Sequence, residues 1–175
     1  MAIFVPMNCT DPTVCAAFTG HRTCRSGADL PLRRVIGELY ASGVQTFLSG
    51  MAVGFDLAAA EAVLACRSAM PGLRLLAVIP FRGQQQRFSA RDRSRFDRIL
   101  AAADETILLA DAYYPACYLH RNDWLVAHAA TLVTWYDGSP GGTRYTIERA
   151  LACGRRLIHL HPDTPPALAA HPTLF

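Results

Sequence analysis

The chain has 175 residues, which is enough to bury a hydrophobic core in one domain without disulfide bonds. All 17 basic residues are arginine, so phosphate binding by a P-loop lysine and Schiff-base catalysis by a lysine are excluded. The net charge of +3 is too small to indicate nucleic-acid binding by itself, and no apolar run approaches the roughly 18 residues of a membrane span. We therefore expect a cytoplasmic protein without a membrane segment, with a single domain over residues 1–175.

The two ends of the chain are expected to be irregular. Residues 1–14 contain Asp11 and two prolines and lack a basic n-region, so they form a poor signal peptide and predict an arm. Residues 162–175 are interrupted by prolines and predict a tail. The six cysteines show no C-x-x-C spacing, and without an export signal we expect reduced thiols.

Short apolar runs alternate with helical patterns between these ends. Strands are predicted at 15–19, 46–48, 73–81, 106–109, 131–136 and 157–160. Helices are predicted at 30–42, 57–69, 89–103, 118–129 and 143–153. Alternating strands and helices are typical of the α/β class, so we expect a Rossmann-like, doubly wound, mostly parallel sheet of about six strands with helices on both faces.

The turn at residues 49–56, with the sequence SGMAVGFD, falls between a predicted strand and a predicted helix. A turn in this place directs free backbone N–H groups and the positive end of the helix dipole to one spot, where an anion can bind. Gly50 and Gly54 supply the positive φ or the close backbone approach that such a turn needs. Asp56 can cap the helix or contact a ligand hydroxyl. Ser49 has no evident triad partners and is not expected to be a nucleophile.

Two further strand ends carry suitable residues. A second glycine-rich turn at 138–143 precedes a predicted helix, and Gly20, His21 and Arg22 follow the first strand. Because the carboxyl ends of parallel strands share one edge of a sheet, these three loops are expected to meet there. We therefore predict a phosphate or nucleotide site between them.

These turns resemble motifs of the SLOG superfamily of Rossmann-like nucleotide-binding domains. Residues 49–60 resemble the S-G-x-A-x-G-x-D-x-x-A signature of DprA/Smf proteins, and residues 140–148 are similar to the P-G-G-x-G-T-x-x-E motif of LOG-type phosphoribohydrolases. Residues 18–22, 79–86, 121–123 and 142–147 together look most like the YpsA-like branch. The resemblance implies a sensor or regulatory domain that binds a nucleotide or a nucleotide-derived ligand, such as ADP-ribose or a nucleoside phosphate.

The candidate ligand-binding residues combine the three loops with positions that match the family motifs. They are Gly20, His21, Arg22, Ser49, Gly50, Gly54, Asp56, Pro80, Phe81, Arg121, Asn122, Gly141, Gly142 and Thr143. Arg22 and Arg121 are candidate phosphate clamps because a guanidinium binds phosphate as a fork. Arg121 is equally well explained as an exposed arginine on a helix. We expect no cofactor and no metal.

Glu148 is the candidate catalytic residue of an alternative function. It follows the second glycine turn, where a carboxylate can act as an acid or an electrostatic partner at a ribose C1 atom. It can equally complement the dipole of its helix. Arg144 and Tyr145 replace a glycine and a threonine of the LOG motif, which weakens the alternative of a nucleoside-monophosphate phosphoribohydrolase or N-glycosidase.

Six arginines lie between residues 82 and 98, with two aspartates to offset them. They form either a basic face for nucleic acid, as in DprA-like binding of single-stranded DNA, or a solvated helix face with i,i+4 ion pairs. The solvated face is the simpler explanation, so nucleic acid is the less favoured partner. The apolar helix faces also allow a homodimer.

Overall fold

The computed structural model of the protein describes residues 11–24 and 27–163. Most of the expected arm at 1–14 and of the expected tail at 162–175 lies outside these residues. A 3-10 helix, η1 (Pro12–Val14), precedes the first strand, with the Asp11 carboxylate accepting a hydrogen bond from Thr13 N at 2.9 Å.

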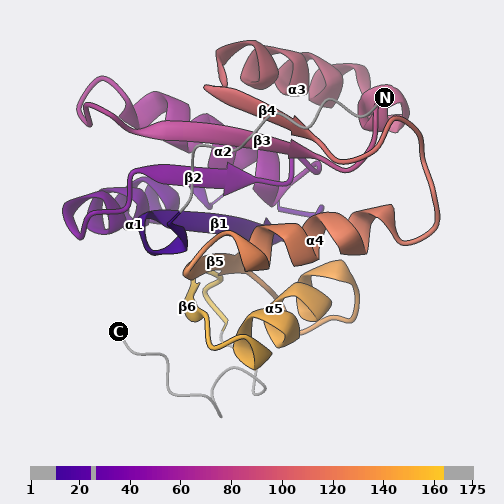
Figure 1. The fold of residues 1–175 in the computed structure, drawn as a ribbon. Coiled ribbons are helices and arrows are strands. Elements are labelled where there is room, and N and C mark those ends of the chain that lie inside the picture. The colour runs from indigo at the N-terminus through magenta and orange to yellow at the C-terminus, as the bar shows by residue number, and fades with distance from the viewer. Residues whose placement is uncertain (1–10, 25–26, 164–175) are drawn as a thin grey trace.

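Within the described residues, six strands form one sheet in the order β4-β3-β2-β1-β5-β6, and every neighbouring pair is parallel (Figure 1). They are β1 (Cys15–Gly20), β2 (Thr46–Ser49), β3 (Arg74–Ile79), β4 (Glu105–Leu108), β5 (Thr131–Trp135) and β6 (Arg156–His159). The predicted Rossmann-like α/β fold is therefore confirmed. The strand order reverses between β1 and β5, and such a switch point opens a crevice beyond the carboxyl ends of the strands.

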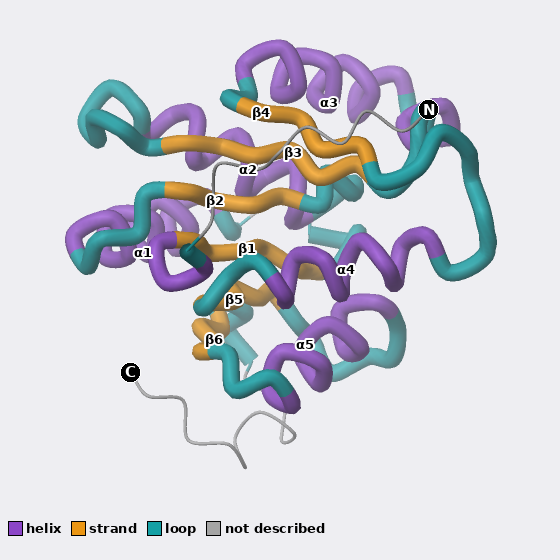
Figure 2. The backbone as a smooth tube through the Cα atoms, in the orientation of Figure 1, coloured by secondary structure: helices purple, strands orange, loops and turns teal. Residues whose placement is uncertain are grey.

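The helices cover both faces of the sheet. On one face lie α1 (Asp29–Ala41), α2 (Phe55–Cys66) and α3 (Ala90–Ala102), and on the other lie α4 (Cys117–Ala127) and α5 (Gly142–Ala152). A short 3-10 helix, η2 (Gln84–Arg87), precedes α3 and was not expected from the sequence. Figure 2 shows the long loop that connects β4 to α4 at the right of the view.

The central strands are apolar because both of their faces are covered. In β1, Ala16 and Phe18 pack with the residues of α1, α2 and α3, while Cys15 and Ala17 pack with those of α4 and α5. The Phe18 ring stacks on Phe47 of β2, with 5.7 Å between the ring centroids. Alternate side chains of a strand point to opposite faces, so a strand covered by helices on both sides is a continuous apolar run.

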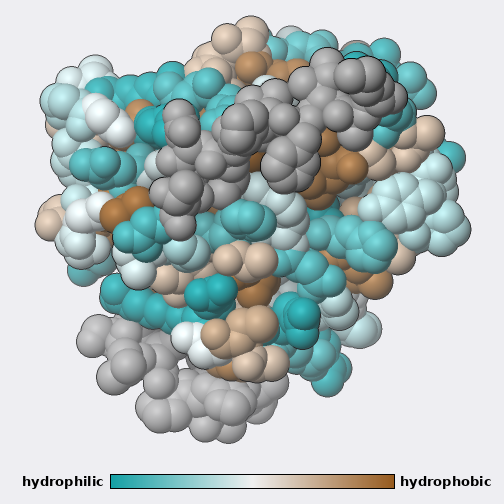
Figure 3. All heavy atoms as spheres, in the orientation of Figure 1, coloured by the Kyte–Doolittle hydropathy of each residue, from teal (hydrophilic) through white to brown (hydrophobic). Residues whose placement is uncertain are grey.

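The described surface mixes polar and apolar side chains on the side shown in Figure 3, which carries α4 and α5. The large apolar side chains that are exposed among the described residues are Val14, Leu30, Tyr113 and Leu119. No helix in the described ranges is long and apolar enough to cross a membrane. The homodimer stays a prediction.

The cysteines depart from expectation at one position. Cys24, Cys66, Cys117 and Cys153 are free thiols, as expected, whereas Cys15 is disulfide-bonded. The expectation of reduced thiols is therefore wrong for Cys15. A disulfide requires two cysteines with Cα atoms within about 7 Å, and spacing along the chain does not reveal that proximity.

Candidate functional site

The loops after β1 and β5 meet at the switch point. His21 N donates a hydrogen bond to Trp135 O at 3.2 Å, and His21 Nε2 lies 2.8 Å from Asp137 Oδ1. The imidazole also stacks on Tyr136, with ring centroids 5.4 Å apart. Hydrogen bonds from Ser139 hold the pKa of Asp137 below its ordinary value, and the nearby His21 acts in the same direction. The structure thus places the predicted residue His21 at the switch point between β1 and β5 and gives it a carboxylate partner that the sequence analysis missed.

The second glycine turn opens α5 after the same β5 loop. Gly141 is the N-cap residue, and no side chain caps the helix. A Cβ atom added to Gly142 would meet its nearest neighbour, Asn122 Nδ2, at 3.7 Å, which is an ordinary contact. Asn122 Nδ2 also donates a hydrogen bond to Gly142 O at 3.4 Å, and Thr143 is buried. Packing does not require a glycine at position 142, and an uncapped first turn suits an anion.

The turn after β2 is held together by its own side chains. Ser49 Oγ donates a hydrogen bond to Asp56 O at 3.0 Å and accepts one from Met51 N at 3.2 Å. The Asp56 carboxylate accepts a hydrogen bond from Ala52 N at 3.4 Å. Both predicted site residues, Ser49 and Asp56, are buried, so their described hydrogen bonds shape the turn itself.

Arg121 of α4 packs against the same turn. Its Nη1 donates a hydrogen bond to Gly50 O and lies 3.8 Å from Asp56 Oδ2, while its Nε donates to Asn122 Oδ1 at 2.8 Å. A Cβ atom on Gly50 would collide with the guanidinium. The Arg121 side chain is 7% exposed, so the interpretation as an exposed helix arginine is wrong. Its role as a phosphate clamp stays a prediction, since its described hydrogen bonds go to the protein.

The buried pair of Asp56 and Arg121 is electrostatically unusual. Burial raises the pKa of Asp56 to about 6, against the opposing effect of the Arg121 charge. Burial also lowers the pKa of Arg121, and here the nearby Asp56 opposes the shift. Burial therefore disfavours the charged form of Asp56, and the positive charge of Arg121 offsets part of this effect.

Gly20 and Gly54 are required by packing. Gly54 has a φ of 86°, and a Cβ atom there would lie 2.5 Å from His21 O. The same carbonyl accepts a hydrogen bond from Phe55 N at 3.2 Å, so one N–H of the first turn of α2 is already satisfied. A Cβ atom on Gly20 would lie 2.5 Å from the Phe55 ring. The turn after β2 is therefore less open to an anion than the start of α5.

Aromatic side chains gather beyond β3. Pro80 is buried, and Phe81 contacts Tyr113 and Tyr118 edge to face, with ring centroids 5.4 and 5.8 Å apart. The Arg22 guanidinium carbon lies 5.7 Å from the centroid of the Tyr118 ring. Tyr113 and Tyr118 were not predicted as site residues. The sequence shows that the segment 113–118 is rich in aromatic residues. It does not show that this segment packs on Phe81, because that contact joins distant parts of the chain.

Glu148 has no described contact with these residues. Its carboxylate pairs with Arg144 Nε at 2.7 Å, and the two side chains are 60% and 56% exposed. The catalytic role of Glu148 stays a prediction.

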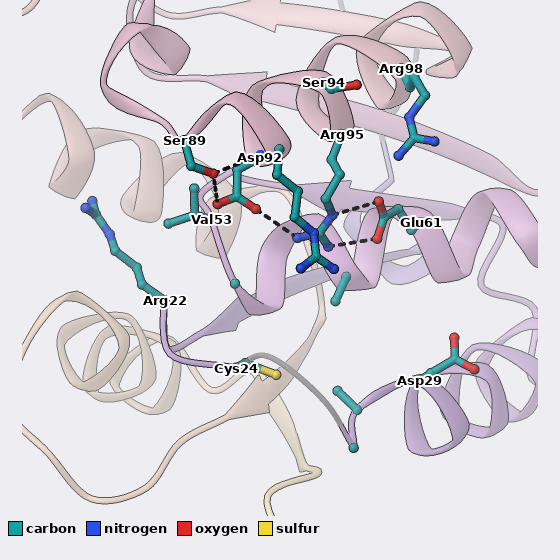
Figure 4. A pocket seen from close by; sticks show the side chains of 15 residues that line it. Arg22, Cys24, Asp29, Val53, Glu61, Ser89, Asp92, Ser94, Arg95 and Arg98 are labelled. Atoms are coloured by element: carbon teal, nitrogen blue, oxygen red, sulfur yellow. Dashed lines mark hydrogen bonds and ion pairs between the residues drawn. The ribbon is translucent and has the colours of Figure 1, made fainter.

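A cavity of about 940 Å³ is lined in part by Arg22 (Figure 4). It lies between the segment that leads into α1, the first half of α2 and the face of α3. Of the predicted ligand-binding residues, Arg22 and Gly54 line it. No three His, Cys, Asp or Glu side chains in residues 11–24 and 27–163 are grouped to hold a metal ion.

The arginines between 82 and 98 do not form the i,i+4 ion pairs of a solvated helix face. Arg82 pairs with Asp111 at 3.1 Å in a different loop. Arg95 pairs with Asp92 three residues earlier at 3.1 Å and with Glu61 of α2 at 2.8 Å. The i,i+4 pairing is therefore wrong. The exposure expected of a solvated face is present, because every arginine of this stretch except Arg95 is exposed.

The sequence of this chain is similar to a family of known proteins and to individual bacterial proteins. The model of the YspA SLOG family matches residues 29–156. The chain is 30% identical over 131 residues to the uncharacterized SPbeta prophage-derived protein YoqJ of Bacillus subtilis, covering 67% of this chain and 77% of that protein. It is 31% identical over 115 residues to a UPF0398 protein of Halalkalibacterium halodurans, covering 64% of this chain and 61% of the relative.

Two solved structures share the fold. DNA processing protein A (DprA) of Streptococcus pneumoniae superposes with a TM-score of 0.65 at 20% identity, covering 92% of this chain and 54% of that one. DprA of Helicobacter pylori superposes with a TM-score of 0.62 at 18% identity, covering 87% of this chain and 66% of that one. At these identities the likeness concerns the fold, and this chain spans roughly half to two thirds of the DprA chains.

Proposed function

Because this chain belongs to the YspA SLOG family, we propose that it binds a nucleotide or a nucleotide-derived ligand at the switch point between β1 and β5. The observation that carries the proposal is the start of α5, where an uncapped helix opens at Gly141 and Gly142 close to the contact between His21 and Asp137. In open α/β sheets, ligands bind beyond the carboxyl ends of the strands at this point. The start of α5 supplies N–H groups for a phosphate.

Groups around the crevice match the remaining parts of a nucleotide. Arg22 is exposed and forms no ion pair among the described residues, so its charge is available to a phosphate. Tyr113 is 61% exposed beside Phe81, and an exposed aromatic ring offers a stacking surface to a base. The role that we propose for a domain that binds such a ligand is that of a sensor or a regulatory domain.

The test uses a glycine that the fold does not need. Gly142→Ala adds a methyl group without a clash, so the variant should be as stable as the wild type but bind ligand at least about tenfold more weakly. Melting temperatures are measured with AMP, ADP and ADP-ribose, each of which should stabilise the wild type if it binds. Gly37→Ala in α1 is the matched control and should retain binding.

Two results would contradict the proposal. The first is that no nucleotide of the panel raises the melting temperature of the wild type. The second is that Gly142→Ala binds as tightly as Gly37→Ala, which would mean that the ligand does not approach the start of α5.

A second candidate function is the binding of single-stranded DNA. DprA of Helicobacter pylori is described as having a single-stranded DNA binding mode, and it shares this fold. Arg87, Arg91 and Arg98 are exposed on η2 and α3, which supports a basic face for the DNA backbone. Binding of an oligothymidylate should then weaken steeply as salt is raised. Absent or salt-independent binding would argue against it.

The phosphoribohydrolase alternative depends on Glu148, whose described partner is Arg144. It requires release of free base from a nucleoside monophosphate and the loss of that release in Glu148→Gln. No base release from any nucleotide would exclude it.

A further inference from the structure

The cavity between α2 and α3 carries charged side chains of both signs (Figure 4). Its charged lining residues are Arg22, Arg91, Arg95, Arg98, Asp29, Glu61 and Asp92. Whether such a cavity attracts a ligand depends on which of these charges are already paired.

Each of the lining acids already has an arginine partner. Glu61 accepts hydrogen bonds from Arg95 Nε at 2.9 Å and Arg95 Nη2 at 2.8 Å, as the dashed lines in Figure 4 show. Asp92 accepts from Arg95 Nη1 at 3.1 Å and from Ser89 Oγ at 2.8 Å. Asp29 pairs with Arg33 at 2.9 Å, one turn along α1. These carboxylates therefore hold Arg95 and Arg33 and leave the other lining arginines without a partner.

Three arginines retain uncompensated charge at the cavity. Arg22, Arg91 and Arg98 are exposed and take part in no ion pair within the described ranges. They come from different places: Arg22 follows β1, while Arg91 lies in the first turn of α3 and Arg98 two turns further along the same helix. Figure 4 shows Arg22 and Arg98 on opposite sides of the cavity. The positive charge is thus spread along the cavity, which suits an elongated anion better than a single phosphate.

The uncharged residues that line the cavity supply hydroxyl groups and apolar surface. Ser89 and Ser94 place hydroxyl groups on the α3 side, while Val53 and Ala58 form a small apolar wall on the α2 side. The volume of about 940 Å³ is at the upper end of the roughly 300–1,000 Å³ typical of small-molecule sites.

We propose that this cavity is a second binding site, which takes a short polyphosphate chain, either free or as part of a nucleoside triphosphate. Several separate guanidinium groups can each contact a different phosphoryl group of such a chain. Arg91 and Arg98 are the specific determinants, and Arg22 lies on the border with the switch point. The site goes beyond the proposed function, because it lies between α2 and α3 and its determinants, Arg91 and Arg98, are not residues of the switch point.

The experiment is calorimetric titration of the full chain with sodium tripolyphosphate, ATP and adenosine at constant ionic strength. Arg91→Gln/Arg98→Gln removes two exposed cavity charges, so it should fold normally, which a thermal melt checks. Arg34→Gln/Arg156→Gln removes the same charge from exposed positions on α1 and β6 that do not line the cavity. Tripolyphosphate should bind the wild type and this control equally and bind the cavity variant at least about tenfold more weakly. ATP should show the same loss when the cavity substitutions are made in the Gly142→Ala background, in which the switch point is weakened, whereas adenosine binding should not change.

The proposal is overturned if tripolyphosphate does not bind the wild type, or binds the cavity variant as tightly as the control. A nucleic-acid surface is indicated instead if an oligonucleotide loses affinity in the cavity variant but tripolyphosphate does not displace it. Gly142→Ala separates this site from the switch point, because tripolyphosphate binding should persist in that variant. If nucleotides fail to bind at the switch point while tripolyphosphate still binds, the proposed function fails and this inference stands.

Discussion

Arg121 donates a hydrogen bond from its guanidinium to the carbonyl oxygen of Gly50, so a side chain of α4 closes the turn that follows β2. The two residues are 71 positions apart in the chain. Gly50 must lack a side chain for the arginine to fit, and the arginine in turn lies 3.8 Å from the buried Asp56. These three residues form one packed unit on which the shape of the turn depends.

Replacing the arginine should destabilise the protein strongly. Arg121→Met leaves the Asp56 carboxylate buried without its cation and Gly50 O without its donor, so we expect a loss of about 3–5 kcal/mol in the free energy of unfolding. Urea denaturation measures it. Arg34→Met is the control, because its side chain is 83% exposed and its ion pair with Glu38 should contribute at most about 0.5 kcal/mol. Equal losses in the two variants would contradict the packed unit.

The buried carboxyl should make stability depend on pH in an unusual direction. Burial raises the pKa of Asp56 from 3.8 to about 6, so between about pH 4 and pH 6 the folded state binds more protons than the unfolded state. The free energy of unfolding therefore falls as pH rises through this window, and the contribution is fully present only below about pH 4.

The variant that isolates this effect is Asp56→Asn, which cannot titrate. We expect the difference in unfolding free energy, wild type minus Asp56→Asn, to fall by on the order of 2 kcal/mol between about pH 4 and pH 7. Urea denaturation at several pH values measures it. Parallel pH profiles for the two proteins would show that the pKa of Asp56 is not raised.

The contact between α2 and the loop after β1 should tolerate no side chain at position 54. Gly54→Ala combines a positive φ with a Cβ atom 2.5 Å from His21 O, and we expect a loss of more than about 2 kcal/mol. Gly43→Ala has a φ of 100° and nothing within 4 Å of the added atom, so it should lose only about 1 kcal/mol. Urea denaturation should show the larger loss for Gly54→Ala, and equal losses in the two variants would exclude the clash.

The helix η2 should stabilise the turn after β2 through one buried amide. Gln84 Nε2 donates a hydrogen bond to Met51 O at 2.8 Å, and Met51 has a φ of 57°, which is uncommon for a residue other than glycine. Gln84→Ala should lower the free energy of unfolding by about 1–3 kcal/mol, because it leaves a buried carbonyl without a donor. Gln85→Ala, at the next position of η2, should change it by less than about 0.5 kcal/mol. Comparable losses in thermal or urea unfolding would show that the amide has no special role.

The strands and helices could be predicted because their signals are local. The continuous apolar run at residues 75–79 indicates a strand covered on both faces, and the structure has β3 at that place. The boundaries were less certain. α2 begins at Phe55, two residues before the predicted start of 57, and the N–H of Phe55 donates a hydrogen bond to His21 O, which is far away in the sequence.

The candidate site was predicted less completely. His21 was identified from its place after a strand, but its partner Asp137 belongs to the loop after β5, and the two meet only because β1 and β5 are neighbours in the sheet. The sequence analysis identified the arginines of α3 as part of a basic stretch, but it did not place them at a cavity. Which arginines stay unpaired depends on the contact of Arg95 with Glu61 of α2.

The α/β class, the order of the elements along the chain and the family motifs can be predicted from the residues alone, because turn chemistry and apolar periodicity are properties of neighbouring residues. The purpose of each glycine depends instead on tertiary contacts. Gly50 and Gly54 must be glycine because a Cβ atom there would clash with side-chain or backbone atoms from distant parts of the chain. A Cβ atom on Gly142 would make only an ordinary contact. The same glycine-rich pattern therefore describes both a packed turn and an open one, since a local pattern does not specify which distant group fills the space beside it.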